Sequence, residues 1–125
     1  MQKVFVYGSL RKGGGLHDVL EDCKFLCFAK TSCNYTMISL GSFPALLEEG
    51  DNSILGEIYE VNKQTLASLD RIEGHPHFYK RTKIKLEDES FVEGYVLNDR
   101  SFTENCEKVL SGNWIAFKYP EFINE

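Results

Sequence analysis

Residues 3–13 read KVFVYGSLRKG, and this stretch decides the fold. Residues 3–7, which begin with Lys3, form a short apolar run, which Gly8 and Ser9 end abruptly. Such a run, bounded by turn residues, is typical of a strand that is buried on both faces. The sequence therefore predicts a central strand close to the N-terminus, followed by a flexible loop that carries Arg11, Lys12 and three consecutive glycines.

Downstream of this loop the sequence is rich in strand signals. Aromatic and β-branched residues cluster in short runs that are separated by glycine, asparagine and serine. Strands are expected at residues 25–29, 35–40, 54–61, 82–86 and 91–97, the last two as a hairpin. Residues 41–45 are expected to form a loop, because Pro44 cannot sit in a central strand.

The helix with the clearest limits spans residues 63–73. Asn62 is a typical N-cap, Gly74 is a typical left-handed residue after the last turn, and Pro76 prevents continuation. Apolar spacing predicts two shorter helices. Their apolar residues are Leu16, Val19, Leu20 and Cys23 in one and Phe102, Cys106, Val109 and Leu110 in the other. Trp114 is then expected to begin a polar tail.

Composition limits the fold class and the partners. The chain has 125 residues, 42% of them hydrophobic, and a formal net charge of −5. We expect one α+β (mixed α/β) domain over residues 1–125, with a core large enough to fold without a disulfide or a metal. The acidic balance excludes a broad footprint for nucleic acid or for anionic lipid.

The sequence also bears on the compartment. It has no run of about 20 apolar residues and no signal-peptide pattern, so no membrane segment is expected. We therefore expect a cytoplasmic protein whose four cysteines are reduced and mostly buried as small apolar residues.

Glu73 is the first candidate functional residue. At about 100° per residue it projects almost between Leu66 and Leu69, which must define the buried face of the helix. Its carboxylate is expected to face the core or a cleft, where desolvation and the negative end of the helix dipole raise its pKa. Such a carboxylate suits proton transfer near neutral pH. The alternative is a solvated glutamate, or one paired with a basic neighbour such as Arg71.

The turn that ends the first strand is the second candidate. In residues 7–10, YGSL, successive backbone N–H groups can form a concave anion site if Gly8 adopts an unusual φ, and Ser9 adds a hydroxyl. The alternative is an ordinary turn from strand to loop. Arg11 and Lys12 are expected to be solvated loop charges. The alternative is that they help to bind a carboxylate.

Several motifs, taken in order, resemble one family. They are VYGSLRKG at 6–13, FPA at 43–45, LDRIEG at 69–74, FYKR at 78–81 and SGNW at 111–114. This ordered set resembles the γ-glutamylcyclotransferase-like family over essentially the whole chain. The short length and the early YGSL resemble its γ-glutamylamine cyclotransferase branch.

The resemblance implies a compact, barrel-like, strongly bent β-sheet with short flanking helices. It also implies that Glu73 is the catalytic general acid/base. Carried over by position, the substrate-binding residues are Tyr7, Gly8, Ser9, Leu10 and Tyr79. No cofactor and no metal are implied.

The activity that the resemblance implies is an intramolecular cyclisation. The α-amine of a γ-glutamylamine or a γ-glutamyl amino acid attacks its own γ-carbonyl, and 5-oxoproline and the free amine are released. The partner is then a small γ-glutamyl substrate, not a nucleic acid or a membrane, while the leaving group and the oligomeric state stay open. The alternative is a non-catalytic small-molecule-binding or regulatory module with the same pocket, which would not need the acid at Glu73.

Two other groups of residues could suggest a functional site, but the sequence supports them less well. Ser9, His17 and Asp18 do not make a hydrolase triad, because neighbouring side chains on a helix diverge by about 100°. His75 and His77 flank a proline and lack a third ligand at a recognised spacing, so a surface turn is expected there instead of a metal site.

Overall fold

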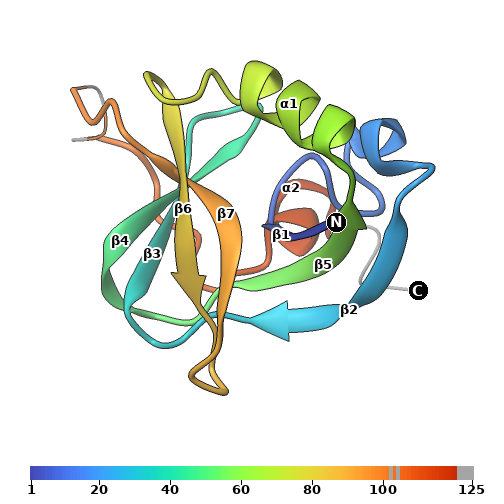
Figure 1. Cartoon of the computed structure of the whole chain (residues 1–125). Helices are drawn as coiled ribbons and strands as arrows, with labels where there is room; N and C mark the ends of the chain where they lie inside the picture. The colour runs from blue at the N-terminus through green and yellow to red at the C-terminus, as the bar shows by residue number, and fades with distance from the viewer. Residues whose placement is uncertain (102, 104, 121–125) are drawn as a thin grey trace.

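The computed structural model describes residues 1–101, 103 and 105–120. Figure 1 shows a strongly curved sheet with one helix, α1, across its upper end. In chain order the elements are β1 (Gln2–Val6), a 3₁₀ helix (His17–Leu20), β2 (Lys24–Lys30), β3 (Tyr35–Ser39), β4 (Pro44–Asn52), β5 (Leu55–Val61), α1 (Lys63–Ile72), β6 (Tyr79–Lys85), β7 (Phe91–Leu97) and α2 (Trp114–Lys118).

The N-terminal strand β1 is the centre of the larger sheet. The strand order is β2-β5-β1-β7-β6, with β1 antiparallel to β5 and parallel to β7. Val4, Phe5 and Val6 are all buried, although their side chains point alternately to opposite faces. The prediction of a central strand buried on both sides is therefore confirmed. The remaining strands, β3 and β4, form a separate antiparallel pair.

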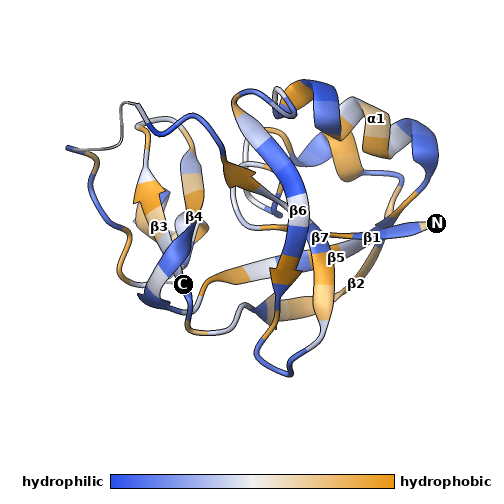
Figure 2. Ribbon diagram, turned by 60° about the vertical axis from the view of Figure 1, so that its left-hand side comes forward, coloured by the Kyte–Doolittle hydropathy of each residue, from blue (hydrophilic) through white to orange (hydrophobic). Residues whose placement is uncertain are grey.

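The two edge strands of this sheet meet at one end. The N–H of Ser32, just after β2, donates to the carbonyl of Lys85 at the end of β6 (2.9 Å). In return, the N–H of Glu87 donates to the carbonyl of Lys30 (3.0 Å). The sheet thus curls toward a barrel, which confirms the mixed α+β fold with a bent sheet and short helices. In Figure 2 the edge strand β6 is largely hydrophilic, as expected of a strand that must not pair with other chains.

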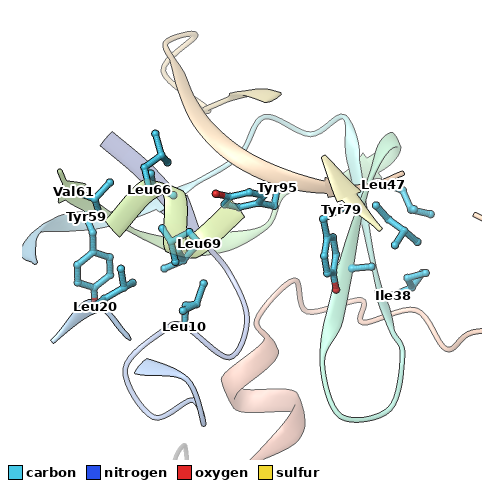
Figure 3. Close-up of a cluster of buried hydrophobic side chains, with 14 residues drawn as sticks. Leu10, Leu20, Ile38, Leu47, Tyr59, Val61, Leu66, Leu69, Tyr79 and Tyr95 are labelled. Atoms are coloured by element: carbon cyan, nitrogen blue, oxygen red, sulfur yellow. The ribbon is translucent and has the colours of Figure 1, made fainter. Parts of the chain in front are cut away.

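The helix α1 packs its leucines onto one face of the sheet. Leu66 and Leu69 are buried in the same cluster as Val4 and Leu10, and Figure 3 shows Leu69 facing Leu10. Phe5 points to the other face and belongs to a second core cluster. Among the described residues, no helix has the length and apolar character needed to cross a bilayer.

Both ends of α1 are fixed by local signals, as predicted. Asn62 Oδ1 accepts the N–H of Thr65 (2.8 Å), and Gly74 has a φ of 66°. The N–H of His75 then reaches back to the carbonyl of Asp70 (2.9 Å), which together with the left-handed glycine forms a Schellman motif. The consequence is that Glu73 is the C-cap, the residue directly after the last helical residue Ile72, and the cap sets its direction.

The prediction of a helix around Cys106, Val109 and Leu110 is wrong. Lys108 instead forms a β-bridge with Ile38, and the N–H of Val109 donates to the carbonyl of Met37 (2.9 Å). Because this backbone pairs with β3, it cannot form helical hydrogen bonds. Leu110 is 79% exposed, so the apolar residues of this segment do not form one buried face as the predicted helix required. Phe102 lies outside the described residues.

The prediction that Trp114 begins a polar tail is also wrong. Asn113 caps a short helix, because its Oδ1 accepts the N–H of Ala116 (3.3 Å). Trp114 starts this helix, α2, and is completely buried in the same cluster as Phe5. The C-terminal segment therefore completes the core on the inner side of the curved sheet.

Three smaller expectations also need correction. The residues after the glycine loop form a single 3₁₀ turn instead of an α-helix. The loop predicted at 41–45 ends earlier, because Pro44 is the first residue of β4, a position where its missing N–H costs nothing. The cysteines are free, but Cys27 and Cys33 are exposed, since Cys27 lies on the edge strand β2 and Cys33 in the turn after it.

Candidate active site

A cavity of about 270 Å³ lies where the end of β1 meets the C-terminal end of α1. Its walls come from the β1 loop, the start of β4, the last turn of α1 and the adjoining parts of β6 and β7. The residues that line it are Phe5, Val6, Tyr7, Gly8, Ser9, Leu10, Leu16, Phe43, Pro44, Ile72, Glu73, Phe78, Tyr79 and Tyr95. All the predicted site residues, Glu73 and Tyr79 included, therefore line one cavity.

Glu73 is a half-buried carboxylate without a partner. Among the described residues, no hydrogen bond or ion pair to its side chain is found. The neighbouring Arg81 instead binds Asp70, with Nε 3.0 Å from Oδ1, and Lys80 pairs with Glu48. Burial raises the pKa of Glu73 from 4.5 to about 7. The geometry therefore excludes the ion-paired alternative and leaves a carboxylate that takes up and releases protons near neutral pH.

Three tyrosines surround Glu73, and their hydroxyls are already used. Tyr7 donates to the carbonyl of Tyr95 (2.7 Å), and Tyr79 donates to the carbonyl of Pro44 (2.6 Å). Tyr95 donates to Asp70 Oδ1 (2.6 Å). Burial, together with the nearby charge of Glu73, raises the pKa of Tyr79, so its hydroxyl stays protonated. The rings thus form walls of the cavity while their hydroxyls tie β1, β4, β6, β7 and α1 together.

The loop at 7–10 uses carbonyls for hydrogen bonds within the protein and leaves N–H groups free. The carbonyl of Gly8 accepts the N–H of Arg11 (3.0 Å), and that of Ser9 accepts the N–H of Leu16 (2.9 Å). Within the described parts of the chain, the N–H groups of Gly8, Ser9 and Leu10 donate no backbone or side-chain hydrogen bond. A group of free N–H donors beside a cavity suits a carboxylate or an oxyanion.

Glycine is needed at position 8, but not for the unusual φ that the sequence suggested. Its φ is not in the left-handed region, which among the glycines contains Gly13, Gly41, Gly50, Gly74 and Gly112. A Cβ on Gly8 would instead lie 2.8 Å from Cγ and 2.9 Å from Cδ of Pro44. The loop and the FPA motif are therefore in direct contact, which explains why both belong to one site.

Arg11 is not the solvated loop charge that the sequence suggested. It is buried and donates from Nε to Glu57 Oε2 (2.9 Å) and from Nη1 to Asn113 Oδ1 (2.9 Å). The guanidinium is thus committed to β5 and the α2 cap, away from the cavity, and it does not line the pocket. Lys12 is exposed, and its ammonium lies 4.6 Å from the ring centre of Phe25.

His17 and His75 have structural roles. His17 Nδ1 lies 2.9 Å from the carbonyl of Leu10, and Asp18 beside it is exposed, so no triad forms with Ser9. His75 Nδ1 accepts the N–H of Arg81 (2.9 Å), which fixes the turn after α1. In the described parts of the chain, no three His, Cys, Asp or Glu side chains are grouped so as to hold a metal ion.

Sequence reasoning missed several residues of this region. Tyr95, Leu16 and Ile72 also line the cavity. Tyr95 does so because β7 lies beside β1, and no local pattern shows that pairing. The buried Glu57 did leave a signal. A charged residue within the apolar run of β5 indicates a buried ion pair, because a lone charge there would be too costly.

Comparison with known proteins identifies the family. Residues 4–116 match the model of the family described as Gamma-glutamyl cyclotransferase, AIG2-like. This chain belongs to that family. A relative from Methanocaldococcus jannaschii is 43% identical over 88 residues, which cover 69% of this chain and 72% of the relative. The gamma-glutamylaminecyclotransferase of Rattus norvegicus is 32% identical over 100 residues, covering 69% of this chain and 64% of the rat protein.

A solved structure agrees with this assignment to the γ-glutamyl cyclotransferase family. The solution structure of protein ytfP from Escherichia coli superposes with a TM-score of 0.70 at 28% identity, covering 93% of this chain and 98% of the other. The bent sheet and short helices that the resemblance implied are therefore confirmed for this family member.

Proposed function

We propose that this chain is a cyclotransferase that acts on a γ-glutamylamine or a γ-glutamyl amino acid, with Glu73 as its general acid/base. One observation carries the proposal. Glu73, with its unpaired carboxylate, and the loop at 7–10, with its free N–H donors, line the same cavity of about 270 Å³. This volume lies just below the range of roughly 300–1,000 Å³ that is typical of ligand pockets, so it suits one small substrate.

The reaction needs no nucleophile from the protein. In a folded γ-glutamyl amide the α-nitrogen attacks the γ-carbon, the new C–N bond closes a five-membered ring, and the bond to the amine nitrogen breaks. The products are 5-oxoproline and the free amine. Holding the substrate in the folded form supplies proximity, and effective molarities of about 10⁵ M or more are reached in well-oriented reactions of this kind.

Glu73 moves the protons. As the α-ammonium group becomes the lactam N–H it loses two protons, and the departing nitrogen gains two as it becomes a free ammonium. A carboxylate within reach of both nitrogens takes each proton from one and delivers it to the other. Its pKa of about 7 keeps both of its forms populated at neutral pH. Protonation of the leaving nitrogen matters because an amide anion is a poor leaving group.

The loop at 7–10 binds the negative charge. Its free N–H groups, with the hydroxyl of Ser9, hold the α-carboxylate or the oxyanion that forms as the γ-carbonyl is attacked. Each donor aimed at charge that develops in the transition state is worth about 3 kcal/mol. Tyr79 contributes its ring to the wall, and its hydroxyl holds the Pro44 carbonyl so that β4 stays against the loop.

The test is a direct assay for 5-oxoproline with the wild type and Glu73→Gln. Glutamine keeps the size of the side chain but cannot exchange protons, so we expect a folded variant that forms no product. The substrates are a panel of γ-glutamyl amino acids and γ-glutamylamines, with circular dichroism as the control for folding. Near-normal turnover by the variant would remove Glu73 from the mechanism. Saturable binding by the wild type without product would favour a binding or regulatory module instead.

A further inference from the structure

The mouth of the cavity is formed by large apolar side chains that remain exposed. Leu16 is 43% exposed, Phe43 39% and Ile72 44%, and all three line the cavity. They come from the glycine loop, the turn before β4 and the last turn of α1. Clustered exposed apolar side chains beside a pocket mark a surface that binds an apolar group.

Aromatic rings continue this apolar wall inward. The rings of Phe43 and Phe78 meet edge to face with their centres 6.2 Å apart, and Phe78 meets Tyr79 in the same way at 4.9 Å. The hydroxyl of Tyr79 donates its proton to the Pro44 carbonyl, so it has no proton to offer a ligand. The wall therefore presents carbon surface from the mouth to the reacting centre.

In the part of the chain that the structure describes, the cavity has few polar groups, and in the proposed reaction the γ-glutamyl group uses them. Among the described residues that line the cavity, Glu73 is the single carboxylate, and none is lysine, arginine or histidine. The hydroxyls of the three lining tyrosines are bound within the protein. Glu73 and the loop at 7–10 remain; the α-ammonium of the substrate takes the first, and its α-carboxylate or γ-carbonyl takes the second. Lys118, close in the fold to Phe43, does not line the cavity and donates to the carbonyl of Gly41 (3.1 Å).

We infer that the leaving group of the substrate is an uncharged, apolar amine, so that the preferred substrate is a γ-glutamyl alkylamide or aralkylamide. This inference rests on the proposed cyclotransferase activity. A leaving group with its own carboxylate would lie against Leu16, Phe43 and Ile72 without a cation. One with a second ammonium would lie there without an anion. A charge that leaves water for an apolar wall without a partner is strongly disfavoured.

Three substrates that differ only in charge test the inference. They are γ-glutamyl-n-butylamide, γ-glutamyl-norvaline, which adds a carboxylate to the first carbon of the butyl chain, and γ-glutamyl-putrescine, which adds an ammonium to its end. We expect kcat/KM for 5-oxoproline release to be at least about tenfold higher for the butylamide than for either charged substrate. Equal or faster turnover of a charged substrate would overturn the inference while leaving the cyclotransferase activity in place. No 5-oxoproline from any of the three would overturn both.

A variant at the mouth links this preference to the named residues. Leu16→Lys places a cation on the apolar rim, so it should raise kcat/KM for the norvaline substrate relative to the butylamide by about tenfold. Leu110→Lys makes the same change at an exposed leucine that does not line the cavity, and should leave that ratio unchanged. An unchanged ratio in Leu16→Lys, or the same rise in Leu110→Lys, would show that the rim does not meet the leaving group.

Discussion

Arg11 Nε lies 2.9 Å from Glu57 Oε2, and both side chains are buried. The two residues are 46 positions apart, and Arg11 directly follows the loop that carries the free N–H donors. Glu57 also accepts the N–H of Lys12 (3.1 Å) and the hydroxyl of Tyr59 (2.8 Å). The loop is therefore anchored to β5 through charge and hydrogen bonds, which holds its N–H groups in place before a ligand arrives.

Breaking this pair from one side should destabilise the fold strongly. Arg11→Met or Glu57→Gln leaves the partner charge buried and uncompensated, and losses of about 3–5 kcal/mol are usual for such changes. The measurement is the free energy of unfolding in urea. The double variant Arg11→Met/Glu57→Leu removes both charges and should recover a large part of the loss. A cost below about 1 kcal/mol for both single variants would contradict the anchoring role.

The proposed role of Glu73 as the base predicts how turnover depends on pH. Its carboxylate accepts a proton only as the anion, and burial raises its pKa to about 7. We therefore expect kcat/KM to fall as pH drops through about 7, where an ordinary glutamate would keep activity to well below pH 5. Initial rates of 5-oxoproline formation between pH 5 and 8 measure this limb. Constant activity over that range would show that Glu73 is not the base.

The same shift makes Glu73 costly for stability. Its pKa is 4.5 when unperturbed and about 7 in the fold, so between these values the folded state binds more protons than the unfolded state. Protonated Glu73 therefore adds its full contribution to the free energy of unfolding below pH 4.5. This contribution is lost as the pH rises through about 7, and the total loss is at most about 3 kcal/mol. Glu73→Gln avoids this loss and should be more stable than wild type at pH 8 but not at pH 4.5.

Urea unfolding at the two pH values checks this prediction. The matched control is Glu21→Gln, the same change at an exposed glutamate, which should track the wild type at both. If Glu73→Gln gains no stability over wild type between pH 4.5 and pH 8, the carboxylate is not desolvated in the folded protein.

The parts of the fold that the sequence predicts are those fixed by neighbours in the chain. Asn62 and Gly74 fix both ends of α1, and with them the direction of Glu73, through contacts of three to five residues. The buried run of β1 is equally local. The resemblance to the family predicted that Glu73 and the loop at 7–10 belong to one site. The residue pattern within either segment does not indicate this.

The features of the fold that the sequence does not predict are fixed by contacts between residues far apart in the chain. The helix expected near Val109 is absent because its backbone pairs with Met37, more than 70 residues earlier. Arg11 looked solvated because glycines and a lysine surround it in the chain, while its partner Glu57 lies in another strand. Local patterns report propensity, and tertiary pairing overrides it wherever a better partner lies elsewhere in the chain.

The hydroxyl of Ser9 should assist the reaction without being essential to it. It lies among backbone N–H donors that remain in Ser9→Ala, so we expect a reduced kcat/KM with residual 5-oxoproline formation well above that of Glu73→Gln. Complete loss of activity, together with an acyl-serine trapped in the wild type and seen by mass spectrometry, would favour a hydrolase mechanism instead.

The contact between Gly8 and Pro44 predicts a sharp difference between two glycines of one loop. In Gly8→Ala the new Cβ would lie under 3 Å from two atoms of the Pro44 ring, so the loop or the start of β4 must move. Overpacking of this kind costs about 1–3 kcal/mol, and a loop displaced by even a fraction of an ångström no longer aims its N–H groups correctly. We expect a folded protein with kcat/KM reduced by about 100-fold or more.

Gly15→Ala is the matched control for this change. A Cβ on Gly15 meets nothing within 4 Å, and its φ is not left-handed. This variant should therefore keep both its activity and its stability, within about 0.5 kcal/mol. Measuring 5-oxoproline formation and urea unfolding for the pair separates the two explanations for the glycine at position 8. If Gly8→Ala behaves like Gly15→Ala, the close approach of Pro44 does not hold the loop, and the donors must be positioned by the Arg11–Glu57 pair alone.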